Sequence, residues 1–314
     1  MNGLPGSSLR PVNVIVGIVA LAVGLNAHGY EGSYHQKLTF LAAIQFNRCV
    51  TKTAVPRITP LQVRYVAKSN IRQAETNIFV RMFNWSYYDR GAQAERSALW
   101  LIDTRFHKHF NEVVENMGGS GSATERYRNL GRVVNYVQDV TSPARSVPVY
   151  TARFWRLNLA DRFDSFPVDE EAVEKALLES CVYLDSARDS YLDILADAAS
   201  TTLAAVQGPM TGMPVSWETF WKLSDDEHGF GEYGPAGNNF GRKSEFRCGE
   251  AERCVLLDDD PLYADFALQR HIAAVIGTMR AIMVFQSDGL PVVAKEAVVA
   301  EEAVVAEETV VAKE

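Results

Sequence analysis

The stretch LGRVVNYVQDVTSPARSVPVY, residues 130–150, decides the fold and locates the candidate functional residues. Its first half carries apolar residues at the spacing of one helical face, which predicts a helix that starts near residue 124. Asn135 and Asp139 are four residues apart and therefore project from the same side of this helix. Pro143 is expected to end the helix, and Arg145 follows just beyond it.

Outward from this stretch, helical patterns dominate between residues 30 and 290. The first predicted helix covers 35–50 and places Leu38, Leu41 and Ile44 on one apolar face. Thr59 and Pro60 have the pattern of an N-cap followed by proline at the first helical position. The other predicted helical segments are 59–69, 74–87, 93–117, 169–207 (one helix or two) and 261–286.

The segment 223–260 is rich in glycine and aromatic residues and has no regular period, so a long loop is expected there. No segment shows the sustained alternation that is typical of strands. The sequence therefore predicts an all-α fold with a single multi-helix domain over residues 30–290, carrying this long Gly-rich loop.

The two ends of the chain have their own composition. Arg10 precedes an apolar run over 12–24 that is too short to span a bilayer, which predicts an export signal over residues 1–29 and a secreted or periplasmic protein. Cleavage after residue 27 or after residue 29 fits the pattern, and an uncleaved anchor is the alternative. Residues 291–314 repeat a six-residue unit rich in Glu and are interpreted as an acidic low-complexity tail.

Charge and cysteine content narrow the possible partners. The formal net charge of −8 argues against a nucleic-acid partner, because counterion release needs a positively charged face. Four cysteines fit an oxidising compartment, and Cys248 and Cys254, six residues apart, are the expected pair.

The 130–150 stretch resembles a motif of the zinc-dependent phospholipases C, whose fold is shared with single-strand-specific zinc nucleases. The family motif runs HYxxDxxxPxH, and this chain has NYVQDVTSPAR at residues 135–145. Tyr136, Asp139 and Pro143 keep their places in the motif. Asn135 and Arg145 stand where histidines are expected.

The resemblance implies a set of metal donors. They are Tyr30 (through its amino group, if cleavage follows residue 29), His35, Glu75, Asp139 and Asp164. Where the chain departs from the family, Arg145 is expected to bind a phosphate group through its guanidinium, and Asn135, Ser86 and Thr151 are the other expected binding residues.

The replaced histidines lead to two functional expectations. An Asn carbonyl is a poor zinc ligand and Arg cannot ligate, so zinc is expected to be weakly held or absent, with phosphodiesterase activity reduced or lost. Such a protein would bind a phospholipid headgroup, another phosphate-bearing ligand or a protein partner, with contact to a membrane surface. The alternative is an active metal-dependent phospholipase C, in which Asp139 is the catalytic residue that orients or deprotonates the attacking water.

Two plainer interpretations stay open. Asp139 forms an ordinary salt bridge with Arg145 or Arg132, or His35 is a structural, partly buried histidine at the start of a helix.

Overall fold

Eight α-helices form most of the part of the chain that the computed structural model describes. The described residues are 32–74, 87–90, 104–118, 121–150, 160–178, 181, 184, 189–226, 229–250 and 252–288. Helices account for 61% of them and strands for 8%, so the predicted all-α class is confirmed. The predicted export signal, the predicted acidic tail, the predicted helix 74–87 except its two end residues, and the stretch 93–103 lie outside the described residues.

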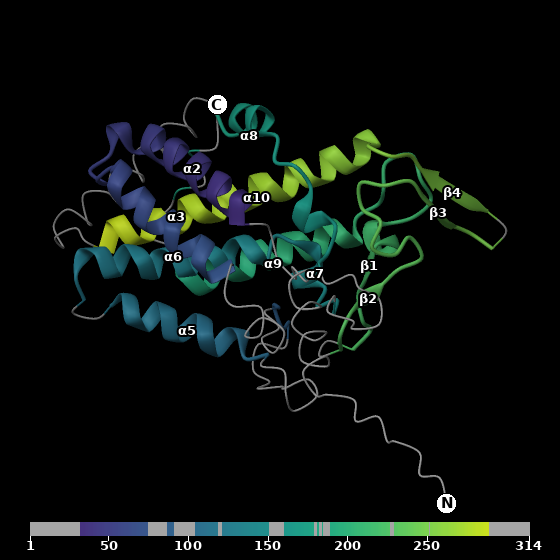
Figure 1. Ribbon diagram of the computed structural model, residues 1–314, viewed down its shortest axis with the longest axis horizontal. Helices are drawn as coiled ribbons and strands as arrows, with labels where there is room; N and C mark the ends of the chain where they lie inside the picture. Colours follow the sequence, from purple (N-terminus) through teal and green to yellow (C-terminus); the bar gives the residue numbers. More distant parts are fainter. Residues whose placement is uncertain are drawn as a thin grey trace, which may run out of the picture.

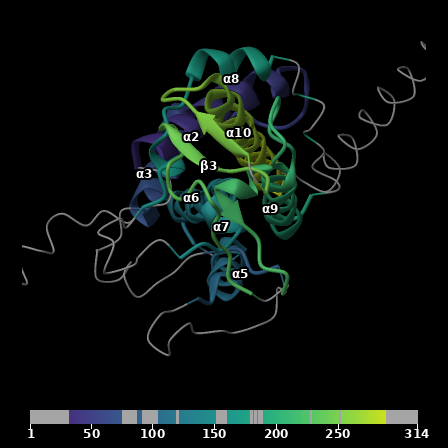
Figure 2. The same ribbon diagram turned by 90° about the vertical axis from the view of Figure 1, so that its right-hand side faces the viewer.

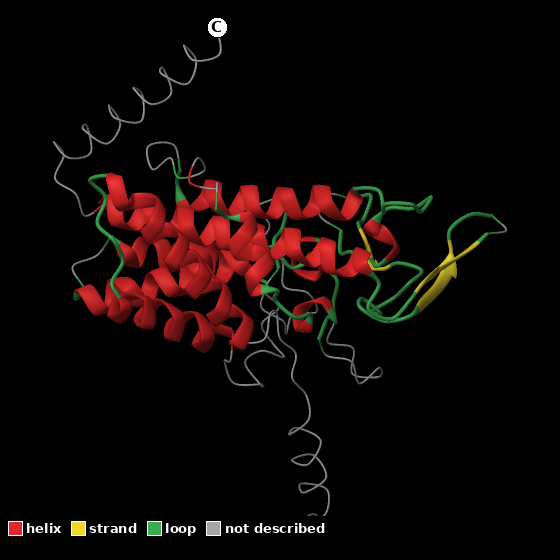
Figure 3. Ribbon diagram, turned by 90° about the horizontal axis from the view of Figure 1, so that it is seen from above, coloured by secondary structure: helices red, strands yellow, loops and turns green. Residues whose placement is uncertain are grey.

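Five long helices lie side by side along the length of the molecule (Figures 1 and 3). They are α2 (Gly32–Cys49), α3 (Pro60–Ala74), α6 (Ala123–Asp139), α9 (Tyr191–Gln207) and α10 (Pro261–Asp288). Helix α10 packs against α2, α6 and α9, and α3 packs mainly against α6. The apolar core therefore runs between these helices, with α6 and α10 at its centre.

Two further helices flank this bundle, as the end-on view of Figure 2 shows. Helix α5 (Phe106–Met117) packs against α6, and α8 (Glu170–Ala176) packs against α2 and α10 on the opposite side. Helix α5 ends at Met117, as predicted, and Gly118 follows it. The segment 169–207 forms two helices, α8 and α9.

Side-chain caps fix where several helices begin. Helix α3 starts at Pro60, and the Thr59 hydroxyl accepts from the Gln62 amide while the Gln62 side chain accepts from the Thr59 amide. This reciprocal pairing is a capping box, and it confirms the predicted start. Helix α9 starts with a second capping box, formed by Ser190 and Asp193.

Two expectations about helices were wrong in detail. Helix α6 ends at Asp139, before Pro143, because the chain turns at residues 140–142; Pro143 instead begins the short helix α7 (Pro143–Ser146), where its missing N–H costs nothing. On α2, Ile44 is 46% exposed, because the buried face follows Leu38, Ala42 and Phe46. Three-residue steps drift around a helix of 3.6 residues per turn, and Ile44 has left the apolar face.

The segment expected to be a structureless loop contains two small antiparallel sheets, which corrects that prediction. Strand β1 (Trp221–Lys222) pairs with β2 (Glu232–Tyr233), and β3 (Ser244–Arg247) pairs with β4 (Arg253–Leu256). Strands of two to four residues are too short to show an alternating pattern in the sequence. The β3–β4 hairpin projects from one end of the bundle (Figures 1 and 3).

Of the two disulfides, one closes a short local loop and the other links segments that are far apart in the sequence. Cys248 pairs with Cys254 across the turn of the β3–β4 hairpin, which confirms the expected pair. Cys49, at the end of α2, pairs with Cys181, beyond α8. None of the described helices combines the length and the apolar character needed to cross a bilayer.

Candidate functional site

A polar cluster lies buried between α2, α3, α6 and α10. Gln138 of α6 is at its centre, fully buried and bonded through every polar atom of its side chain. Its Oε1 lies 2.7 Å from His35 Nδ1 and accepts from Asn70 Nδ2 at 2.9 Å. Its Nε2 donates to the hydroxyl oxygens of Thr39 and Thr278, at 3.3 and 3.1 Å. Four helices are thus joined through one side chain.

Helical spacing explains how these side chains meet. His35 and Thr39 are four residues apart on α2, and Asn135, Gln138 and Asp139 lie within four residues on α6, so each set projects from one helical face. The Thr39 hydroxyl donates to the His35 carbonyl, and its oxygen is then free to accept from Gln138.

The hydrogen bonds of the cluster indicate which nitrogen of the His35 ring carries the proton. Because the oxygen of a carboxamide only accepts, His35 Nδ1 carries a proton and donates it to Gln138. The other nitrogen, Nε2, lies 3.4 Å from Asn135 Nδ2 and 3.4 Å from Asp139 Oδ1. Asn135 also donates to Asn70 Oδ1 at 3.0 Å, so its amide group is already bound within the cluster.

A second group of polar side chains gathers beyond the C-terminal end of α6. Asp161 precedes the short 3-10 helix Phe163–Ser165, and Asp164 lies within it; both are almost completely buried. Asp161 accepts from Trp221 Nε1 and from the Tyr233 hydroxyl, at 2.8 and 2.9 Å. Asp164 accepts from the Ser142 hydroxyl at 2.5 Å.

The segment that carries these carboxylates is held by an aromatic cluster. The ring of Phe163 packs against the rings of Trp221, Phe240 and Phe266, with centroids 5.3 to 6.0 Å apart. The Gly-rich segment after α9 therefore provides both the packing that fixes the 3-10 helix and the Trp221 donor that holds Asp161.

Burial raises the pKa of both Asp161 and Asp164, because desolvation penalises a charged carboxylate. The negative charge of Asp161 raises the pKa of Asp164 further, and Asp139 adds to this effect. The positive charge of Arg145 opposes the shift at both carboxylates. Three carboxylates and one guanidinium thus interact at the end of α6, where Arg145 is partly exposed.

Five of the predicted site residues therefore converge in one region although they come from α2, α6, α7 and the 3-10 helix. His35, Asn135 and Asp139 are in direct contact, and Arg145 and Asp164 interact electrostatically beside them. Four other predicted residues, Tyr30, Glu75, Ser86 and Thr151, lie outside the described residues.

The donors present in the described residues do not fit a zinc cluster. No group of three or more His, Cys, Asp or Glu side chains in the described ranges is arranged to hold a metal ion. His35 Nδ1 is used by Gln138, and the atoms around His35 Nε2 are one amide nitrogen and one carboxylate oxygen. Arg145 adds a fixed positive charge that would repel a cation.

The sequence motif did not reveal several members of the cluster. Gln138, Asn70 and Thr278 bind the predicted residues, yet each is a single polar side chain in an otherwise apolar or mixed helix. A glutamine in the run VVNYVQDV, flanked by buried valines, is the one signal that points to a buried polar contact. Asp161, which accepts from Trp221, is likewise not marked by any motif in the sequence.

Comparison of the chain with protein-family models, with curated proteins and with solved structures found no match.

Proposed function

We propose that this protein is an exported relative of the zinc-dependent phospholipases C in which a hydrogen-bonded polar cluster takes the place of the metal cluster. It has reduced or lost phosphodiesterase activity and binds a phosphate-bearing ligand through Arg145. The observation that carries the proposal is the contact of Asn135 and Asp139 with the same nitrogen of His35, at 3.4 Å each.

This contact supports the resemblance to the phospholipases C, and it also supports the proposal that the zinc cluster has been replaced. The family motif requires positions 135 and 139 to face a histidine from the first helix, and these positions do so here. The side chain at 135 is an amide that donates to Asn70 and lies against His35, where the family would have a ligating imidazole. An amide at position 135 is a poor zinc ligand, so the cluster offers a metal fewer donors than the family motif would.

Arg145 supports binding of a phosphate group. It is the cationic side chain that acts on both Asp161 and Asp164, and it is partly exposed at the end of α6. Burial raises the pKa of both carboxyls, and the positive charge of Arg145 acts in the opposite direction, so the guanidinium lies close enough to both to interact with them. A guanidinium binds phosphate through two parallel charge-assisted hydrogen bonds.

The two disulfides support export. Cys49–Cys181 and Cys248–Cys254 use all four cysteines of the chain, and disulfides persist mainly in oxidising compartments.

The first test is to purify the protein without chelator, measure its zinc content by elemental analysis and assay hydrolysis of a lecithin substrate. We expect a folded protein with less than one tightly bound zinc and little or no turnover. Two or more tightly bound zinc ions together with turnover would overturn the proposal in favour of an active phospholipase C.

The second test restores the histidines of the motif. Asn135→His combined with Arg145→His is expected to raise zinc affinity at least tenfold, because two imidazoles join His35 and Asp139. The matched control, Asn135→Gln with Arg145→Gln, removes the charge without adding a ligand and should leave zinc affinity low. Equal affinity in the two variants would contradict the assignment of these positions.

The third test uses phosphocholine as the probe for the ligand. Arg145→Gln should weaken its binding about tenfold or more, since a charge-assisted pair is lost. Arg57→Gln, an exposed arginine whose side chain bonds Thr51, is the control and should change the affinity little. Absence of phosphocholine binding to the unmodified protein would contradict the role of Arg145.

A further inference from the structure

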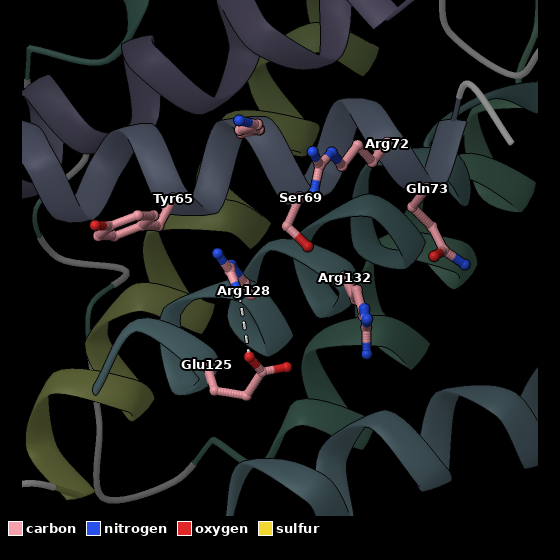
Figure 4. A pocket seen from close by; sticks show the side chains of 8 residues that line it. Tyr65, Ser69, Arg72, Gln73, Glu125, Arg128 and Arg132 are labelled. Carbon is pink, nitrogen blue, oxygen red and sulfur yellow. Dashed lines mark hydrogen bonds and ion pairs between the residues drawn. The ribbon is translucent and has the colours of Figure 1, made fainter. Parts of the chain in front are cut away.

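A pocket of about 360 Å³ opens between α3 and α6, on residues that the buried polar cluster does not use. Figure 4 shows the lining side chains Ser69 and Arg72 on α3 and Arg128 and Arg132 on the neighbouring α6. The volume lies within the range of small-molecule sites, near its lower limit.

The crossing of the two helices explains why the pocket is there. Gly131 of α6 lies directly against α3, so close that a β-carbon at this position would collide with the Val66 carbonyl oxygen and approach Ser69 Cβ to 2.8 Å. Long side chains cannot pass between backbones at such a crossing, so they extend to its side. The pocket is lined by these displaced side chains.

The lining is strongly cationic. Lys68 and Arg72 are four residues apart on α3, and Arg128 and Arg132 are four residues apart on α6, so each pair forms a row along one helical face. Glu125 is the single carboxylate among the described residues that line the pocket, and it pairs with Arg128 at 3.3 Å. In this part of the chain, four cationic groups and one carboxylate line the pocket.

The pocket is lined mainly by positive charges, although the chain as a whole is acidic, with a formal net charge of −8. Like charges four residues apart on a helix repel each other. Arg132 is held by a neutral acceptor, Asn129 Oδ1, at 3.1 Å, which orients its guanidinium without neutralising it. An anion in the pocket would relieve the repulsion between the two rows.

We propose that this pocket binds a small polyanion that carries two or more phosphoryl groups, of about the size of pyrophosphate. Arginines from both helices line the pocket, and guanidinium groups bind phosphoryl oxygens through paired hydrogen bonds; Ser69, which is buried, adds a hydroxyl to the lining. The site does not depend on Arg145 or on the loss of zinc, so it stands apart from the proposed function.

Isothermal titration with inorganic pyrophosphate tests the proposal. The unmodified protein should bind it, more weakly as salt is added, because the contacts are charged. Lys68→Gln with Arg72→Gln, and separately Arg128→Gln with Arg132→Gln, should each lower the affinity about tenfold or more. Circular dichroism checks that each variant is folded.

One control separates this site from other cationic groups. Arg64 is exposed on α3 but does not line the pocket, so Arg64→Gln should change the affinity less than about twofold. The proposal is overturned if the unmodified protein shows no pyrophosphate binding at low ionic strength, or if Arg64→Gln weakens binding as much as the pocket variants do.

The source of the phosphoryl groups is decided by sedimentation with phosphatidylcholine vesicles that contain phosphatidic acid. Vesicle binding that pyrophosphate competes away, and that the pocket variants lose, assigns the site to a lipid headgroup. Retained pyrophosphate binding without vesicle binding assigns it to a soluble phosphorylated compound.

Discussion

At the scale of single residues, Gln138 shows that the candidate site depends on hydrogen bonds among its own buried side chains. Its four side-chain hydrogen bonds reach α2, α3 and α10 from α6. A buried hydrogen bond contributes little net stability. Removing one of its two groups, however, leaves the other buried without a partner, and this lowers the free energy of unfolding considerably. The cluster is therefore specific in its geometry and sensitive to the loss of any member.

We predict that Gln138→Leu lowers the free energy of unfolding by about 3 kcal/mol or more, because His35, Asn70 and two threonines lose a buried partner. Urea unfolding followed by circular dichroism measures this change. Gln36→Leu, on the exposed side of α2, is the control, with a change within about 0.5 kcal/mol. Similar small losses in both variants would show that the partners of Gln138 re-pair easily.

A second prediction at this scale concerns the pH dependence of stability that Asp164 causes. Its pKa is well above the ordinary value of 3.8 in the folded protein, because burial and the nearby Asp161 disfavour its charge. The folded state then binds more protons than the unfolded chain, so the free energy of unfolding falls as the pH rises above 3.8 toward the folded pKa.

Asp164→Asn is expected to remove this fall, since the amide oxygen still accepts from Ser142 and carries no charge. Urea unfolding at several pH values between about 4 and 7 should show the variant gaining on the unmodified protein as the pH increases. Asp193→Asn is a contrasting control: the Ser190 hydrogen bonds lower the pKa of Asp193, so its contribution is present above 3.8 and lost as the pH falls through the folded pKa. An unmodified protein that grows steadily more stable relative to Asp164→Asn would contradict the prediction.

The sequence predicted part of this site and missed the rest for a physical reason. Spacing along one helix places Asn135 and Asp139 on one face, and the motif adds His35, which the structure brings into contact with both. The bonds from Gln138 to Asn70 and Thr278 join different helices. Periodicity describes one element at a time, so it contains no information about which helices face each other.

At the scale of elements, helix ends and crossings were predictable to different degrees. The start of α3 at Pro60 follows from local capping chemistry, which the sequence displays. The end of α6 at Asp139 does not follow from Pro143, because proline is equally suited to the first turn of the next helix. The close approach of α3 and α6 rests on a glycine whose neighbour lies on another helix.

We predict that Gly131→Ala destabilises the protein by about 2 kcal/mol, although alanine is the better helix former by about 1 kcal/mol. The added methyl group meets the Val66 carbonyl and Ser69, and a backbone carbonyl within a helix cannot move aside cheaply. Thermal unfolding measures the change. Gly121→Ala is the control, because its β-carbon would meet only Glu125 at ordinary contact distance, 3.5 Å. A stabilised Gly131→Ala protein would mean that the helices separate at little cost.

At the scale of the whole molecule, the helical bundle and the Gly-rich segment depend on each other. The bundle supplies Asp139 and Arg145, while the segment after α9 supplies Trp221 and Tyr233, which hold Asp161 in place. The composition of this segment predicted a long loop. Its short strands and its aromatic packing could not be recognised from the local sequence. They form through contacts with Phe163 and α10, which lie far away in the sequence.

We predict that the two disulfides contribute unequally to the free energy of unfolding of the whole chain. Cys49–Cys181 closes a loop with a sequence separation of 132, whereas Cys248–Cys254 closes one of 6. If a disulfide acts mainly by limiting the unfolded chain, the long loop is worth about 5 kcal/mol and the short one about 2 kcal/mol. Cys49→Ala with Cys181→Ala should therefore lower the free energy of unfolding clearly more than Cys248→Ala with Cys254→Ala, as measured by urea unfolding of each variant. The long bridge also joins the C-terminal end of α2 to the segment beyond α8. Equal costs for the two pairs would instead show that the bridges act through the folded state, where each one fixes only its own surroundings.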